Sequence, residues 1–283
     1  MSAQPLYITC NGETVPVARA MVHVHNPAVT SALGVYETVE LANGHLFHLE
    51  DHLHRLERSA AAIDLPLPAS LPELARWARR TAEEADQRDG ILRILALAAD
   101  AYRPSQVYMM LFPPMRHPQH LYEHGATAIT FVGERALPTA KTLNTLVNFL
   151  AQRAARARGC HEALLVARDG IREGATSNLF VVMHGKLVTP PDHLVIAGVT
   201  RDIVLRLARE LGYAITFRPL PPQSIPLWEE AFITSTSRHV MPLTVVDGQP
   251  VGSGAVGPVT QQLRAAFERY FAAQVGRTAV PTP

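Results

Sequence analysis

The chain has 283 residues, of which 47% are hydrophobic and 18% charged, and its formal net charge is +1 at pH 7. A chain of this length and composition can bury a full hydrophobic core and forms one large domain or two modest ones. The near-neutral charge, without a long basic run, gives no electrostatic footprint for nucleic acid. The amino terminus lacks a basic start followed by an apolar run, and no stretch approaches the roughly 18 consecutive apolar residues of a membrane span. We therefore expect a cytoplasmic protein without a nucleic-acid or membrane partner.

The first half of the chain favours an antiparallel meander followed by helices. Strand patterns cover residues 5–12, 13–24 and 34–49, and Asn43-Gly44 predicts a tight hairpin turn within the last of these. Apolar residues then recur at helical spacing from Leu49 to Ile63, and a second helix is expected over Glu73 to Glu84. Two apolar strands are expected at 91–99 and 106–112.

A domain boundary is expected in segment 113–125, which contains three prolines and shows no periodicity. We place the cut near Pro118, which gives an N-terminal domain 1–117 and a C-terminal domain 118–283 that carries Lys141. The expected elements of the second domain are strands at 126–133, 162–167, 178–189 and 231–236, a turn at 168–177, and helices after Lys141, over 200–212 and up to Gln274. Strands and helices mix without a regular strand–helix–strand repeat, so the predicted fold class is α+β.

Lysine is scarce in this sequence. Of the 26 basic residues two are lysine, Lys141 and Lys186, and the rest are arginine. A guanidinium stays protonated and cannot form an imine, whereas a lysine amine can attack an aldehyde. Lys141 is the better candidate for such chemistry, because it stands where an extended, proline-marked segment gives way to an amphipathic helix. The alternative is that both lysines are ordinary surface residues.

An aldehyde cofactor on Lys141 would be pyridoxal 5′-phosphate, which brings further requirements. Its phosphate needs backbone N–H donors at a helix N-terminus, and residues 197–201 open an amphipathic helix of this kind. Its pyridine nitrogen needs a carboxylate, and Glu173 precedes a glycine-containing turn and an apolar strand. The alternatives are that Thr200 is an ordinary N-cap and that Glu173 is a solvated turn residue.

Five motifs, in order along nearly the whole chain, resemble one enzyme family. They are Gly34-Val-Tyr-Glu-Thr-Val, His52-Leu-His-Arg-Leu, Lys141-Thr-Leu-Asn followed by Glu173-Gly-Ala-Thr-Ser-Asn-Leu-Phe, Gly198-Val-Thr-Arg-Asp, and Thr234-Ser-Thr-Ser. The chain is similar to the class IV, fold-type IV, pyridoxal-phosphate enzymes, which include branched-chain aminotransferases, D-amino-acid aminotransferases and aminodeoxychorismate lyase. The resemblance implies a two-domain α+β fold with the cofactor in the cleft between domains, and a homodimer.

The resemblance also implies the roles of individual residues. Lys141 forms the Schiff base with the cofactor and then moves the substrate proton, and Glu173 pairs with the pyridine nitrogen. The implied phosphate ligands are Arg55, Val199, Thr200 and Thr236. An ordinary helical ion pair is the alternative for Arg55. The implied activity is transfer of an amino group from an amino acid, of the D-amino-acid or branched-chain type, or from a small amine to a 2-oxo acid such as 2-oxoglutarate or pyruvate.

The substrate-binding positions depart from the relatives' patterns. Ile91 stands where branched-chain enzymes carry a tyrosine, and Ser105 stands where D-amino-acid enzymes carry a histidine. The candidates to bind the substrate carboxylate are Arg103, Arg93 and Arg238, in that order. The further candidate substrate-binding residues are Tyr36 and Ser237.

Two other functions remain open at this point. A lyase of the same fold would release pyruvate from aminodeoxychorismate and would need no amino acceptor. A metal hydrolase could use the histidines of segment 45–54, because His48 and His52 stand four residues apart on a helix face. That segment has no HExxH pattern, so we expect no metal.

Overall fold

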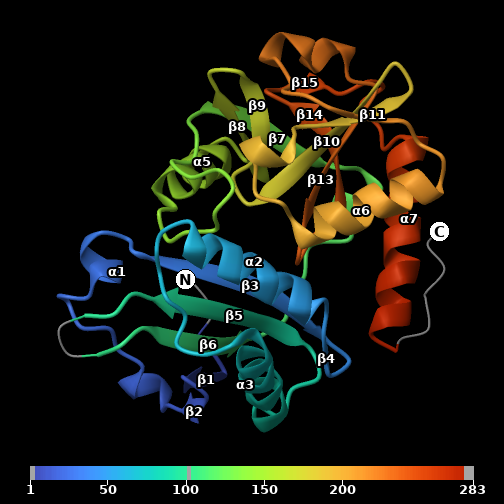
Figure 1. Cartoon of the computed structure of the whole chain (residues 1–283). Coiled ribbons are helices and arrows are strands. Elements are labelled where there is room, and N and C mark those ends of the chain that lie inside the picture. The colour runs from blue at the N-terminus through green and yellow to red at the C-terminus, as the bar shows by residue number, and fades with distance from the viewer. Residues whose placement is uncertain (1–3, 101–102, 277–283) are drawn as a thin grey trace. The chain divides into compact units, whose positions relative to one another are not determined.

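The computed structural model describes residues 4–100 and 103–276, and the chain divides into two compact units. Within the described residues, unit 1 holds 4–115, apart from 101–102, together with 140–144 and 273–276. Unit 2 holds 116–139 and 145–272. The elements of both units are labelled in Figure 1.

Unit 1 is built on a six-stranded sheet with the strand order β2-β1-β6-β5-β3-β4, in which every pairing is antiparallel. Its strands are β1 (Tyr7–Cys10), β2 (Glu13–Thr14), β3 (Gly34–Ala42), β4 (His45–Leu46), β5 (Gly90–Leu97) and β6 (Gln106–Phe112). Its helices are α1 (Pro27–Thr30), α2 (Leu49–Ala61) and α3 (Leu71–Glu84), with a 3-10 helix at Val17–Arg19.

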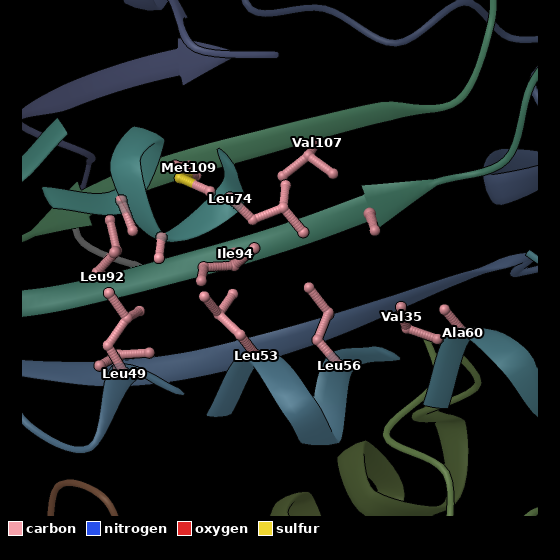
Figure 2. Packing of buried hydrophobic residues seen from close by; sticks show 14 of the residues in the cluster. Val35, Leu49, Leu53, Leu56, Ala60, Leu74, Leu92, Ile94, Val107 and Met109 are labelled. Carbon is pink, nitrogen blue, oxygen red and sulfur yellow. The ribbon is translucent and has the colours of Figure 1, made fainter. Parts of the chain in front are cut away.

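One face of this sheet packs against α2 and α3. Successive side chains of a strand point to opposite faces, so Val35, Val39 and Leu41 of β3 share a face with Glu37. Figure 2 shows Leu49, Leu53 and Leu56 of α2 meeting strand residues such as Ile94. The opposite face of β3 carries Tyr36, Thr38 and Glu40, which are half-buried. Glu37 is therefore a carboxylate on the hydrophobic side of the sheet.

The local signals of unit 1 are partly confirmed. Asn43 and Gly44 adopt φ angles of 51° and 83° between β3 and β4, which is the predicted hairpin turn. The strand predicted over 13–24 is wrong, because the strand ends at Thr14 and the segment continues through the 3-10 helix. Pro16 has no N–H to donate to a neighbouring strand. The prediction followed the alternation of apolar residues, and that alternation does not report the missing donor.

Unit 2 contains a nine-stranded sheet with the order β12-β11-β10-β13-β14-β7-β8-β9, in which β15 pairs with β14. An additional pairing of β9 with β10 closes β10, β13, β14, β7, β8 and β9 into a ring. The strands are β7 (Ala126–Val132), β8 (Glu162–Ala167), β9 (Gly170–Gly174), β10 (Ser177–Met183), β11 (Lys186–Thr189), β12 (Ile215–Phe217), β13 (Glu230–Ser235), β14 (His239–Val246) and β15 (Gln249–Pro250).

The helices associated with this sheet differ in length and burial. They are α4 (His120–Glu123), α5 (Leu146–Ala157), α6 (Val199–Glu210) and α7 (Pro258–Gln274), with 3-10 helices at Asp192–Leu194 and Pro222–Leu227. Among the helices that the structure describes, none combines the length and the apolar character needed to cross a membrane. The mixture of helices with parallel and antiparallel strand pairs confirms the α+β class.

The predicted domains differ from the two units at three points, one of which is that residues 273–276 belong to unit 1. The first change of unit falls between Met115 and Arg116, close to the predicted cut near Pro118. The segment Ala140–Asn144, however, belongs to unit 1, whereas Lys141 was predicted in the C-terminal domain. Backbone contacts with β3, more than a hundred residues earlier, decide this assignment, and no local pattern reports them.

Four strands of unit 2 were missed, namely the short strands β12 and β15 and the two longer strands β9 and β14. The predicted turn over 168–177 contains β9, whose two glycines and two charged residues hide its strand character. No strand was predicted over His239–Val246, yet β14 runs there and includes Pro242. Strands β9 and β14 lie beside predicted site residues, so their absence from the prediction affects the site as well as the fold.

Candidate active site

Lys141 lies on a short segment that runs along the start of β3 in unit 1. The Lys141 carbonyl accepts a hydrogen bond from Tyr36 N at 3.0 Å, and the Lys141 N–H donates to Ser59 Oγ at 3.0 Å. A bridge between Val35 and Thr142 continues this pairing. A side chain at Gly34 would place its Cβ 2.7 Å from a carbonyl oxygen of β5, so glycine is required for this close approach. The backbone of Lys141 is thereby held on both sides.

The amine of Lys141 lies against an aromatic face. Lys141 Nζ is 4.4 Å from the centroid of the Tyr36 ring, and the guanidinium carbon of Arg93 is 5.3 Å from the same centroid. Lys141 and Tyr36 are half-buried, while Arg93 is exposed. Lys186, by comparison, is the exposed first residue of β11. Of the two lysines, Lys141 has the ordered surroundings that a nucleophile needs.

Arg55 lies on the helix-covered side of the sheet, in a buried ion pair. Its Nε and Nη2 donate to the two carboxylate oxygens of Glu37 at 2.7 and 2.8 Å. His52 Nδ1 is 2.8 Å from Glu37 Oε2. Burial opposes ionisation of Glu37, but Arg55 and His52 hold the pKa of Glu37 far below its usual range. This fixes one edge of the Arg55 guanidinium, and the implied phosphate contact of Arg55 remains a prediction.

His52 is the buried partner of this pair rather than an accessible metal ligand. Burial lowers the pKa of His52 below its ordinary value, although Glu37 acts in the opposite direction. His48 Nδ1 bonds Asp51 Oδ2 at 2.5 Å. Within residues 4–100 and 103–276, no group of three or more histidine, cysteine, aspartate or glutamate side chains could hold a metal ion.

Glu173 lies near the end of β9 in unit 2 and is buried. Its Oε2 accepts a hydrogen bond from Ile196 N at 3.3 Å. Asn178 of β10, the register partner of Glu173, donates from Nδ2 to the Ile196 carbonyl at 2.8 Å. The two side chains hold the loop before α6 from two sides. The interpretation of Glu173 as a solvated turn residue is therefore wrong.

The N-terminus of α6 is built for close approach of an anion. Its N-cap is Gly198, and no side chain among the described residues caps it. Thr200 is the second residue of the helix, so its interpretation as an N-cap is wrong. A Cβ on Gly198 would lie 2.1 Å from Asn178 Oδ1, which leaves room for backbone alone. Backbone N–H groups and the helix dipole favour phosphate at such an end.

Polar atoms at the end of β13 fit a polar ligand as well. Thr234 Oγ1 and Ser235 Oγ are buried and make no hydrogen bond with the residues that the structure describes. A buried hydroxyl without a partner is unfavourable unless a ligand or water completes it. Thr236, the next residue, is a predicted phosphate ligand in the turn between β13 and β14. The donor set of this edge of unit 2 thus fits the phosphate of pyridoxal 5′-phosphate.

The other predicted substrate residues have more varied surroundings. Ser237 Oγ lies 3.4 Å from His117 Nε2. Burial, with Arg238 and His239 nearby, lowers the pKa of His117 to about 4. Arg103 is exposed, and its backbone N–H donates to Asp100 Oδ1 at 2.9 Å. Arg238 bonds Glu162 and Thr176, so its guanidinium already has protein partners.

Four residues that organise these contacts were not predicted. They are Glu37, Ser59, Glu162 and Asn178. Glu37 was detectable, because an acidic residue interrupts an otherwise apolar face of a strand that precedes an arginine-bearing helix. Glu162 and Asn178 likewise stand at the starts of buried strands. Ser59 gave no signal, because its partner is 82 residues away in the sequence.

Comparison with known proteins identifies the relatives of this chain. The family described as amino-transferase class IV matches residues 34–246. D-alanine aminotransferase of Bacillus licheniformis is 32% identical over 278 residues, covering 95% of this chain and 98% of that protein. Branched-chain-amino-acid aminotransferase of Escherichia coli K12 is also 32% identical, over 94% of this chain and 93% of that protein.

Solved structures agree with these relatives. The crystal structure of the E. coli branched-chain amino acid aminotransferase superposes with a TM-score of 0.87 at 30% identity, covering 98% of this chain and 96% of that one. The branched-chain amino acid aminotransferase from Thermobaculum terrenum, in its PLP-form, gives a TM-score of 0.84 at 27% identity, also covering 98% of this chain and 96% of that one.

Proposed function

Because the chain belongs to the class IV aminotransferase family, we propose that it transfers an amino group from an amino acid to a 2-oxo acid with pyridoxal 5′-phosphate as cofactor. The proposal depends mainly on the position of Lys141. Its amine lies 4.4 Å from the Tyr36 ring centroid, and its backbone is hydrogen-bonded to β3 and to Ser59. The cofactor, when bound, supplies an aldehyde for an amine and a ring that withdraws electrons from the substrate Cα.

The chain's own residues supply the positioning and the proton transfer. Lys141 would hold the cofactor aldehyde through its amine, and as a free amine its Nζ would be the general base that takes the proton from the substrate Cα. The Glu173 carboxylate, held by Ile196 N, would keep a proton on the pyridine nitrogen. The α6 N-terminus at Val199 and Thr200 would hold the phosphate, with Arg55 and Thr236 as further ligands.

Arginines are the proposed anchors for the substrate carboxylate. Arg93 is exposed and lies near the ring that Lys141 also faces, which supports its assignment. Arg103, Tyr36 and Ser237 complete the proposed substrate contacts. An exposed guanidinium can bind a carboxylate through two parallel hydrogen bonds. Arg238 remains a prediction for this role, and its contacts favour another function.

Trapping with borohydride tests the assignment of Lys141. Reduction of the purified protein with its cofactor, followed by peptide mapping, is expected to place the pyridoxyl group on Lys141. The variant Lys141→Arg is expected to lose the visible cofactor band and turnover, because a guanidinium forms no imine. Lys186→Arg is the matched control and should remain active. A pyridoxyl group on Lys186, or an active and yellow Lys141→Arg variant, overturns the proposal.

A substrate panel defines the amino donor. Rates with D-alanine, L-leucine and (R)-1-phenylethylamine, each with and without 2-oxoglutarate, distinguish the donor classes. Turnover of aminodeoxychorismate without an amino acceptor would instead establish the lyase. The cytoplasmic location expected from the sequence and the homodimer implied by the family resemblance belong to this proposal, and cell fractionation and sedimentation test them.

A further inference from the structure

Arg238 connects two turns of unit 2 that carry proposed cofactor residues. It lies between β13 and β14, in the turn that contains Thr236 and Ser237. Its guanidinium reaches the turn between β9 and β10, which closely follows Glu173. We infer that Arg238 is a positioning residue. It fixes the turn between β9 and β10, here called the Glu173 turn, relative to the turn between β13 and β14, here called the Thr236 turn. This inference rests on the proposed function, because it concerns the same cofactor.

The contacts of Arg238 are specific at both ends of the residue. Nη1 is 3.1 Å from Glu162 Oε2 and 2.7 Å from Thr176 Oγ1. The Arg238 carbonyl accepts a hydrogen bond from Tyr122 OH at 3.1 Å. The arginine side chain is 14% exposed, whereas the Glu162 side chain is completely buried. Arg238 is therefore fixed at its backbone and at its guanidinium.

Glu162 gathers the donors of the Glu173 turn. Its Oε2 accepts hydrogen bonds from Thr176 Oγ1 and Ser177 Oγ, both at 2.9 Å. Gln152 of α5 and the backbone N–H of Ala163 donate to Oε1. Four protein donors and one guanidinium thus surround a single buried carboxylate. A charge-assisted network of this kind is strong when complete and costly when one member is lost.

The turn packs directly on this carboxylate. A Cβ on Gly174, the residue after Glu173, would lie 2.2 Å from Ser177 Oγ and 3.1 Å from the Glu162 carboxyl carbon. Asn148 of α5 adds a hydrogen bond from Nδ2 to the Ala175 carbonyl at 2.6 Å. A shift of the Glu162 carboxylate would therefore move the backbone that carries Glu173.

The same contacts argue against Arg238 as the anchor of the substrate carboxylate. Binding substrate would draw the guanidinium away from Glu162. Glu162 would then be a buried carboxylate without its cationic partner, which is strongly unfavourable. Arg93 is exposed, so binding of a substrate by Arg93 would break no buried ion pair of this kind. The geometry assigns Arg238 to Glu162 and leaves substrate binding to other arginines.

A double-mutant cycle tests the inference. The variants are Arg238→Gln, Glu162→Gln and the double variant, with the exposed Arg168→Gln as control. Arg238→Gln is expected to weaken binding of pyridoxal 5′-phosphate by about 10- to 100-fold, by analogy with the loss of residues that orient the direct ligands of a metal. It should also shift the pH midpoint of the visible cofactor band, because Glu173 moves relative to the ring nitrogen. In the double variant, the cofactor affinity and the pH midpoint should both return most of the way to their wild-type values, because the buried carboxylate is removed together with its partner.

Three results would overturn the inference. The first is unchanged cofactor affinity and an unchanged pH midpoint in Arg238→Gln. The second is a raised KM for carboxylate substrates in Arg238→Gln that remains raised when Glu162→Gln is added. That result would make Arg238 a substrate anchor. If Arg238→Gln does not fold, Thr176→Val serves in its place, because it removes a neutral member of the network. No change in cofactor affinity in Thr176→Val is the third contrary result.

A failure of the proposed function would give a different outcome. Absence of a pyridoxyl group on Lys141 in the wild-type protein would remove the aminotransferase assignment. The coupling between Arg238 and Glu162 would still be measurable in the cofactor-free protein, from the unfolding free energies of the same four proteins. The two conclusions can therefore fail independently.

Discussion

Lys141 Nζ lies 4.4 Å from the centroid of the Tyr36 ring, and the Lys141 carbonyl accepts a hydrogen bond from the Tyr36 N–H at 3.0 Å. The two residues therefore contact each other through backbone and side chain, although 105 positions separate them in the sequence. An ammonium over an aromatic face gains electrostatic energy, and the ring restricts the lysine rotamers. Tyr36 thus sets the direction in which the amine points.

Replacement of Tyr36 tests this orientation. Tyr36→Leu removes the aromatic face and is expected to slow a single turnover by about 2- to 30-fold, which corresponds to the usual range of cation–π energies. Tyr36→Phe keeps the face and should retain most of the rate. Stopped-flow absorbance of the first half-reaction measures both. An equal loss in Tyr36→Phe would show that the hydroxyl, rather than the ring, is the important group.

Glu37 should contribute strongly to the stability of unit 1. Glu37→Gln leaves the buried Arg55 without its carboxylate and is expected to lower the free energy of unfolding by about 3–5 kcal/mol. Urea denaturation measures this change. Glu50→Gln, which removes the exposed partner of Arg79, is the control and should have little effect. A small effect of Glu37→Gln would mean that water compensates Arg55.

The same carboxylate predicts a pH dependence. Because the pKa of Glu37 is lowered by folding, its contribution to stability is complete above its unfolded pKa of about 4.5 and is lost as the pH falls below that value. Thermal unfolding of the wild type and of Glu37→Gln should therefore converge in acid. A constant difference in Tm from pH 7 to pH 3 would contradict the assignment.

Gly198 should tolerate no side chain. Gly198→Ala places a Cβ 2.1 Å from Asn178 Oδ1, so either the loop before α6 or Asn178 must move. We expect weaker binding of pyridoxal 5′-phosphate, by about 10-fold or more, because the N–H groups of the first helical turn are displaced. Adding Asn178→Ala restores the space and should recover part of the affinity. Fluorescence titration with the cofactor checks both, and an unaffected Gly198→Ala would place the phosphate elsewhere.

His117 predicts a second pH dependence, of different origin. Folding lowers its pKa from 6.5 to about 4, so the unfolded chain takes up a proton first as the solution is acidified. Above about pH 6.5 the protonation of His117 does not affect the free energy of unfolding. As the pH falls from about 6.5 to about 4, that free energy decreases progressively. His117→Asn should reduce this loss in a Tm series. The exposed His184→Asn, which keeps a residue type that tolerates its positive φ angle, is the control and should follow the wild type.

The sequence by itself determined the elements with strong local signals. Helical spacing of apolar residues predicted α2, and Asn43-Gly44 predicted the turn after β3. The scarcity of lysine drew attention to Lys141, and the ordered motifs indicated the family. These features depend on neighbouring residues alone, so composition and periodicity report them.

The tertiary structure decided which distant residues meet. It placed the Lys141 segment beside β3, bonded Arg55 to Glu37, and turned Arg238 toward Glu162 rather than leaving it open. Each of these contacts joins strands, helices or turns that are separate in the chain, and two of them, Arg55 with Glu37 and Arg238 with Glu162, give a buried carboxylate its cationic partner. Periodicity cannot predict such a partner, because the energy of a buried ion pair depends on the final three-dimensional arrangement and not on spacing along the chain.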